Sequence, residues 1–323
     1  MTSSLYTTAQ IAGMSTSAIA ALGTDVIQGF TTAQVGALSA TQVAALSTAQ
    51  VAALTTANVP GLSATAIAAL SSAQVTALGT AAEAALSSAQ VQALSSGGVG
   101  ALTTAEVSAQ IAELKPTQIA AVSTAAIAAL GTAALAAFTT ADVAALTTAQ
   151  VAALGTNASA LTSTALAGLS ATQVAALSTA QVAALTTANV PGLSATSIAA
   201  LSSAQVTALG SADVLGLTKI QFMALTSQAL SALTSAEISG LSTLNLSALS
   251  ASQFSAITSA AMQGLTSSEM AALSTTEIAA FTSSQLNAVT TTAIGGLTTS
   301  QIAAFTGQQI SQMTPAETTQ IFG

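Results

Sequence analysis

Few side chains in this sequence of 323 residues could do chemistry. It has ten carboxylates, two lysines (Lys115 and Lys219) and no Arg, His or Cys. Without His and Cys it lacks the usual general bases, thiol nucleophiles and soft-metal ligands. Its many Ser and Thr hydroxyls would need a neighbouring base to act as nucleophiles. We therefore expect that the protein is not an enzyme and that it uses no cofactor or metal.

The scarcity of charged residues limits the kinds of molecule that the protein can bind. Charged residues make up 4% of the chain, against about 25% in ordinary proteins. Two cations cannot neutralise a run of phosphates, so we expect no nucleic-acid partner. Pairs of Ser and Thr interrupt the apolar residues every eight positions, which argues against a membrane span. The first residues, MTSSLYTTAQIAGM, lack the pattern of a cleavable signal peptide.

A hydrophobic residue recurs every eight residues, and we number each octad from it. The consensus is Leu, Ser/Thr, Ser/Thr, Ala, Gln, Val/Ile, Ala, Ala. Residues 1–323 therefore form a single continuous repeat array, with register breaks near 5–14, 102–114 and 154–161. Residues 38–79 recur at 169–210 with one difference, Ala66 against Ser197, which indicates that a block was copied.

Three conformations compete for this octad. In one long α-helix the Leu stripe would rotate by about 80° per octad, so no face would stay apolar. In a β-solenoid, positions 1 and 6 differ in parity and would point to opposite faces of a flat strand. Each octad would then need a turn, and turn residues are scarce. A β-solenoid stays as the alternative, and short helices explain more of the positions.

Position 2 fits a helix N-cap, because Ser and Thr accept a hydrogen bond from the amide three residues later. Position 5 is then N3, and its Gln, Glu or Asp completes a capping box. Seven of the ten carboxylates stand at position 5, where the helix dipole favours them. Pro116 and Pro315 fall at N1, which accepts proline. Pro60 and Pro191 fall inside the expected helix, so we expect those two helices to end early.

We predict an all-α fold, an α-helical solenoid of short capped helices of about 6 or 7 residues. Such helices are unstable alone, so the apolar residues at positions 1 and 6 must be buried between octads. Small Ala residues at positions 4, 7 and 8 would allow close packing. The number of octads per turn and the hand stay open. The expected structural residues include Leu46, Ser47, Gln50, Val51, Leu54, Thr55, Leu177, Ser178, Gln181 and Val182.

We expect the remaining charged and aromatic residues to have structural roles. The segment SAQIAELKPTQ holds Glu113 near Lys115 at a register break, and we expect a kink or a lengthened helix there. The Phe residues occupy positions 1 and 6, so we assign them to the core.

Runs such as LSTAQVAALTTANV (Leu46 to Val59) resemble the low-charge Leu-Ser/Thr-x-x-Gln-Val/Ile repeats of large bacterial secreted or cell-surface proteins. The resemblance covers nearly the whole chain. It implies a bacterial, exported protein with a structural or adhesive role, located outside the cell or on its surface. Calcium-binding nonapeptides that often accompany such proteins do not occur in this sequence.

The expected function is structural, as an extracellular filament subunit whose partner is another copy of itself. A solenoid exposes apolar surface at its ends unless polar repeats cap them. Head-to-tail stacking that does not close makes a fibre. The alternative is an adhesin or a repetitive surface that binds ice or a glycan. The residues expected at the assembling ends are Leu5, Ile11, Met14, Phe305, Ile310, Met313, Ile321 and Phe322.

Overall fold

The computed structural model describes residues 5–323, and this range contains helices and no strand. The prediction of an all-α helical solenoid is confirmed, and the β-solenoid alternative is wrong. The chain divides after Leu154 into two compact units. Unit 1 is the part up to Leu154 and unit 2 runs from Gly155 to Gly323, so the division falls at the third register break. Each unit is described by itself.

Unit 1 consists of these helices: α1 (Thr8–Gly13), α2 (Thr16–Ala20), α3 (Thr24–Gln28), α4 (Thr32–Gly36), α5 (Ala40–Ala44), α6 (Thr48–Ala52), the 3₁₀ helix η1 (Val59–Gly61), α7 (Ala64–Ala68), α8 (Ser72–Glu83), α9 (Ser88–Val91), α10 (Ser96–Ala101), α11 (Thr104–Gln110), the 3₁₀ helix η2 (Ile111–Glu113), α12 (Pro116–Ile119), α13 (Thr124–Ala128), α14 (Thr132–Ala136), α15 (Thr140–Ala145) and α16 (Thr148–Ala153).

Unit 2 consists of these helices: the 3₁₀ helix η3 (Gly155–Ala160), α17 (Ser163–Leu166), α18 (Ala171–Ala175), α19 (Thr179–Ala183), the 3₁₀ helix η4 (Val190–Gly192), α20 (Ala195–Ile198), α21 (Ser203–Leu215), α22 (Lys219–Met223), α23 (Ser227–Leu230), α24 (Ser235–Gly240), α25 (Thr243–Leu246), α26 (Ala251–Ala256), α27 (Ser259–Met262), α28 (Ser267–Ala272), α29 (Thr275–Ala280), α30 (Ser283–Leu286), α31 (Thr291–Ile294), α32 (Thr299–Ile302), α33 (Gly307–Ser311) and α34 (Pro315–Phe322).

A typical octad forms one short helix and one corner, as α6 shows. Ser47 has an extended backbone, and its hydroxyl accepts from the Gln50 amide, which begins the helix. The Leu54 amide then donates to the Val51 carbonyl at 3.0 Å, a bond over three residues that tightens the last turn. Most helices therefore span four to six residues. They are shorter than the predicted 6 or 7 because this bond closes each helix before the next octad begins.

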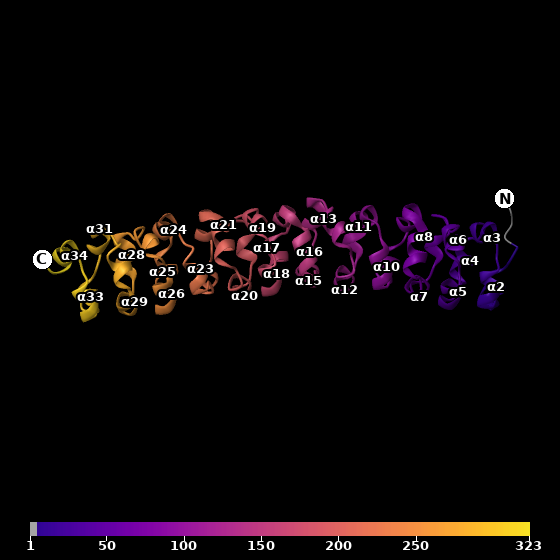
Figure 1. Cartoon of the computed structure of the whole chain (residues 1–323). Helices are drawn as coiled ribbons and strands as arrows, with labels where there is room; N and C mark the ends of the chain where they lie inside the picture. The colour runs from indigo at the N-terminus through magenta and orange to yellow at the C-terminus, as the bar shows by residue number, and fades with distance from the viewer. Residues whose placement is uncertain (1–4) are drawn as a thin grey trace. The chain divides into compact units, whose positions relative to one another are not determined.

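Helices three octads apart pack against one another within each unit. Examples are α3 with α6 in unit 1 and α26 with α29 in unit 2. Figure 1 shows α26 and α29 side by side along one edge of unit 2. Each unit is therefore a superhelix, and we call one turn of it a coil.

The apolar side chains of positions 1 and 6 fill the core between coils. Val51 is 0% exposed and Leu54 is 4% exposed. Burying one such side chain contributes about 1.5–3 kcal/mol. Small residues let the coils approach closely. A Cβ on Gly61 would lie 2.1 Å from the Thr32 carbonyl oxygen, and one on Gly192 would lie 1.9 Å from that of Ser163.

The two octads with an internal proline have no α-helix that ends early, so that prediction is wrong, and a 3₁₀ helix over positions 6 to 8 takes its place. Pro60 and Pro191 lie in the 3₁₀ helices η1 and η4 in place of α-helices. Asn58 and Asn189 replace the usual Gln at position 5, and the Asn58 Oδ1 accepts from the Thr55 amide at 2.7 Å.

The register break at 102–114 contains a lengthened helix followed by a 3₁₀ turn, α11 and η2. Gln110 and Ile111 are buried there like residues at positions 5 and 6 of an ordinary octad. Residues 110–113 thus act as positions 5 to 8 of an octad whose first half is missing. The break is better described as a half octad than as an insertion.

Gly79 and Gly131 both stand at position 2 of an octad in unit 1, but their backbone conformations differ. Gly79 has φ of +72° and ψ of 158°, a region that essentially only glycine adopts, and it divides α8 into two helical pieces at a kink. Gly131 has φ of −73° and provides no side-chain cap. A Cβ would meet no atom within 4 Å at either position. We expect Gly79→Ser to destabilise unit 1 by about 1–2 kcal/mol, because a side chain disfavours positive φ. Gly131→Ser should stabilise it by about 0.5 kcal/mol by adding a cap. Urea unfolding followed by circular dichroism measures both changes in stability. Equal effects of the two variants would contradict the different backbone conformations of Gly79 and Gly131.

Candidate functional site

The glutamine at position 5 connects its own octad to the preceding coil. The Gln50 Oε1 accepts from the Ser47 amide at 2.8 Å, which caps the helix. Its Nε2 donates to the carbonyls of Ile19 at 3.0 Å and Leu22 at 2.8 Å. The side chain is 2% exposed, so these bonds lie in a dry interior.

The same pair of bonds recurs in both units. Each of these amides donates to carbonyls 31 and 28 residues earlier, at position 6 of the fourth octad back and position 1 of the third. A coil therefore takes between three and four octads. We call this row of amides and carbonyls the amide seam. Its regular members are Gln42, Gln50, Gln74, Gln90, Gln150, Gln205, Gln221, Gln285, Gln301 and Gln309.

The structural residues expected from the sequence occupy core and capping places. The apolar members are all buried, and they are Leu46, Val51, Leu54, Leu177 and Val182. Ser47 with Gln50 and Ser178 with Gln181 form reciprocal capping boxes. Thr55 begins the octad of η1, where its amide donates to Asn58.

The residues expected at the assembling ends divide into three groups. Leu5 is 80% exposed, Ile310 43% and Phe322 50%. Met14, Met313 and Ile321 are half-buried. Ile11 and Phe305 are buried in the core of their own units. Three of the eight side chains are therefore free to contact another molecule.

Hydroxyls at position 3 form a second contact between coils that the sequence did not indicate. The Thr32 Oγ1 donates to the Ala57 carbonyl at 2.9 Å, and the Ser203 Oγ donates to the Gln228 carbonyl at 2.8 Å. Both pairs are 25 residues apart. The spacing could be recognised only once the number of octads per coil was known.

Glutamates in the amide seam cannot replace both functions of glutamine. An ionised carboxylate accepts the capping bond but has no hydrogen to donate to the carbonyls. One buried oxygen, Oε1, of Glu269, Glu277 and Glu317 has no hydrogen-bond partner among the described residues. Burial raises the pKa of Glu277, although hydrogen bonds from Ser274 oppose this effect. Burial also raises the pKa of Asp213.

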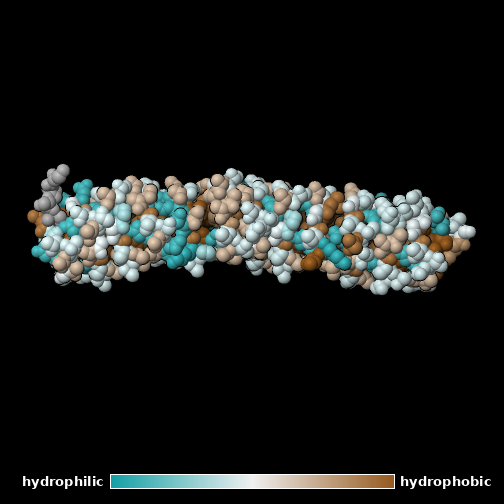
Figure 2. All heavy atoms as spheres, turned by 180° about the vertical axis from the view of Figure 1, so that it is seen from behind, coloured by the Kyte–Doolittle hydropathy of each residue, from teal (hydrophilic) through white to brown (hydrophobic). Residues whose placement is uncertain are grey.

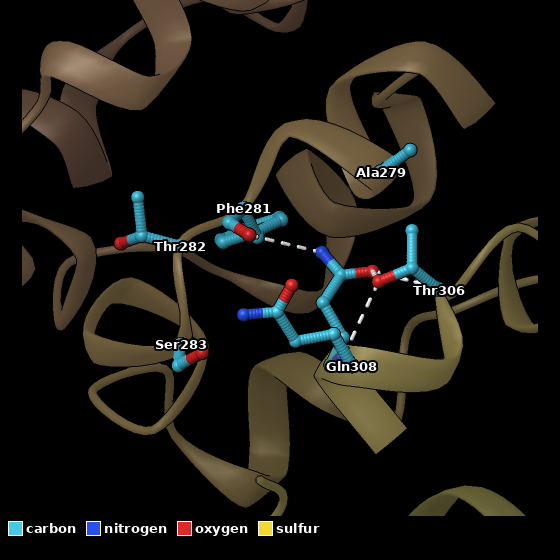
Figure 3. A pocket seen from close by; sticks show the side chains of 7 residues that line it. Ala279, Phe281, Thr282, Ser283, Thr306 and Gln308 are labelled. Carbon is cyan, nitrogen blue, oxygen red and sulfur yellow. Dashed lines mark hydrogen bonds between the residues drawn. The ribbon is translucent and has the colours of Figure 1, made fainter. Parts of the chain in front are cut away.

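Unit 2 has a hollow of about 390 Å³ between α29 and α33. Its lining residues are Ala279, Phe281, Thr282, Ser283, Thr306, Gln308 and Gln309. The Gln309 Nε2 donates to the Phe281 carbonyl at 3.0 Å. Figure 3 shows the Gln308 amide beside Ser283 at the hollow. The lining supplies hydroxyls, amides and one aromatic ring but no titratable group, so it suits hydrogen bonding more than acid–base chemistry.

The surface carries few strongly polar side chains. Figure 2 shows a face of mostly intermediate hydropathy, with small hydrophilic and hydrophobic areas. Within residues 5–323, no three acidic side chains gather in a way that could hold a metal ion. No helix in the same range has the length and apolar character needed to cross a bilayer.

Comparison with known proteins identifies the repeat. The model of a family described as the ALTTAQ repeat matches residues 24–56, 67–104, 124–156, 159–187 and 278–315, which is just over half of the chain. A comparison with curated proteins found no match.

The missing donor at Glu277 gives a prediction about stability. Glu277→Gln should supply a donor to the carbonyls of Leu246 and Leu249, as Gln309 does to Ile278 and Phe281. We expect unit 2 to gain about 1–2 kcal/mol near neutral pH. The raised pKa means that wild-type Glu277 is destabilising above its folded pKa and not below its ordinary value of 4.5. The gain should therefore shrink as the pH falls toward 4.5.

Urea unfolding at several pH values measures this gain. Glu277→Ala is the control, because it removes the same charge from unit 2 without supplying a donor. A gain of the same size in the control would show that net charge, and not the seam, is responsible.

Proposed function

The chain belongs to the ALTTAQ repeat family, and we propose that it is a structural protein that assembles end to end into filaments. The observation that supports this proposal is the direction of the amide seam. Each coil donates through glutamine amides to the coil before it and offers carbonyls to the coil after it.

Such an interface is heterologous, because the two faces of a coil are different and complementary. Contacts of this kind build fibres when the rotation between neighbours does not close a ring. The repeat makes the faces of different coils nearly equivalent, so a coil of one molecule can replace the next coil of another.

The terminal coils carry exposed apolar side chains that could join such a contact. Leu5 lies before α1, whereas Ile310 and Phe322 lie in α33 and α34. Stacking would remove these side chains from water. The low charge favours association, although the net charge of −8 opposes it weakly.

We place this filament outside the cell or on a bacterial surface. Trypsin-like proteases find two lysines and no arginine in the whole chain, which suits an exposed fibre. The resemblance to repeats of bacterial secreted proteins supports the same location.

The hollow between α29 and α33 favours a second candidate function, the binding of a hydroxylated ligand such as a glycan. Hydroxyls and amides from Thr282, Ser283 and Gln308 could exchange hydrogen bonds with sugar hydroxyls, and Phe281 could pack on a sugar ring.

Negative-stain electron microscopy of the purified protein at micromolar concentration tests the filament proposal. We expect uniform filaments much longer than one molecule. Ile310→Asp combined with Phe322→Asp should abolish them, because two charges would be buried in the contact. Leu244→Asp is the control, since Leu244 is 66% exposed on α25, away from those coils.

Discrete particles of one molecule for the wild-type protein would overturn the filament proposal. Binding of oligosaccharides that Gln308→Ala removes would then support the second candidate. Filaments that resist the double substitution but not Leu244→Asp would place the contact elsewhere.

A further inference from the structure

One octad of unit 1 places an acidic side chain in the hydrophobic core. Glu83 stands at position 6, where every other octad of this unit has Val, Ile or Leu. The side chain is 1% exposed. The corresponding residue after the copied block in unit 2 is Val214. The core position therefore does not require a carboxyl group.

Helix α11, in the following coil, packs against α8 and carries Glu106, whose side chain raises the pKa of Glu83 through a hydrogen bond. A bond between two carboxyl groups requires a proton, because two ionised carboxylates only accept. Glu106 is fixed in its own capping box, where its Oε2 accepts from the Thr103 amide at 2.7 Å. It is 6% exposed. Glu83 is thus the natural holder of the proton, and Glu106 the acceptor.

The half octad, residues 110–113, contacts the main chain of Glu83. The Gln110 Nε2 donates to the main-chain carbonyl of Glu83 at 2.7 Å. The half octad lacks position 2, whose amide would normally bond to the glutamine oxygen. Accordingly, the Oε1 of Gln110 has no partner among the described residues, and neither has the Oε2 of Glu83.

No cation on the neighbouring elements offsets the two carboxyl groups. Helix α8 packs against α6, α10 and α11. Helices α6 and α10 contain no titratable residue, and α11 contains Glu106 alone. Beyond α11, Glu113 on η2 and Lys115 before α12 are exposed. Burial raises the pKa of Glu83 to about 8, and the hydrogen bond and charge of Glu106 add to this effect.

We propose that Glu83 and Glu106 form a proton-sharing latch that holds α8 against α11 and releases it as the pH rises. When Glu83 is protonated, its hydroxyl donates to Glu106 across the two coils. When both groups are ionised, two negative charges repel each other in a dry interior without a donor between them. The half octad is the weak point, because its glutamine lacks the capping bond.

The direction of the pH effect follows from the folded and unfolded states. The pKa of Glu83 is higher in the folded chain than its ordinary value of 4.5. The latch is therefore fully effective below pH 4.5 and is lost as the pH rises through about 8. Acid closes this segment and mild alkali opens it.

Hydrogen exchange of the full chain, followed by mass spectrometry between about pH 5 and pH 9, tests the latch. Protection is calculated against the intrinsic exchange rate at each pH. We expect the protection of residues 72–113 to fall about tenfold or more relative to residues 32–52 of the same unit.

Two variants separate the latch from a general charge effect. Glu83→Gln donates an N–H to Glu106 at every pH, so protection of 72–113 should become independent of pH. Glu113→Gln removes an exposed carboxylate from the same segment and should keep the wild-type pH dependence. A flat wild-type profile, or a Glu113→Gln profile as flat as that of Glu83→Gln, would overturn the proposal.

A direct titration keeps the test decisive if Glu83→Gln folds poorly. In wild-type protein labelled with ¹³C at the glutamate carboxyl groups, one resonance should titrate near pH 8. Titration of all glutamates near their ordinary pKa would contradict the latch. Calcium that restores protection at high pH, with reversal by a chelator, would instead identify a cation site and overturn the proton-sharing assignment.

Discussion

The amide group of the position-5 glutamine is the interaction on which the rest of the structure depends. Its oxygen completes the cap of its own helix, and its nitrogen satisfies two carbonyls of an earlier coil, as Gln50 does for Ile19 and Leu22. Those carbonyls are left over at corners, where short helices would otherwise bury unpaired acceptors. One neutral side chain thus solves two problems, which explains why charge is rare and why the period is so strict.

The seam also explains how the chain tolerates a register break. Gln118 donates to Val91 at 3.1 Å and Leu94 at 2.9 Å, which are 27 and 24 residues earlier. Counted in octads, with residues 110–113 as one, these are again the fourth and third octads back. The superhelix therefore conserves the number of capped corners per coil and not the number of residues. The half octad leaves Gln110 without a capping bond, but the glutamines after it still donate to the fourth and third octads back in the amide seam.

Local chemistry made the helices predictable, whereas contacts between coils were not. Ser47 and Gln50 stand three residues apart, so their capping box could be recognised from spacing alone. The carbonyl partners of Gln50 are 31 and 28 residues away, and finding them requires the number of octads per coil. Because the sequence does not give the number of octads per coil, the pairing of Glu83 with Glu106 could not be predicted either. The sequence does show Glu83 as an acid in an apolar row, but its partner depends on the superhelix.

The copied block shows what the seam tolerates. Ala66 and Ser197 occupy position 5 of equivalent octads, and both are 0% exposed. Ser197 donates to the Leu169 carbonyl at 2.6 Å, whereas Ala66 has no side-chain donor. Both octads keep the same fold, so the loss of one seam bond is acceptable when no charge is buried. A carboxylate in this row is different, because it adds acceptors without donors. Burial raises the pKa of Glu83 and of Glu277, so at these two glutamates the contact between coils depends on protonation as well as on packing.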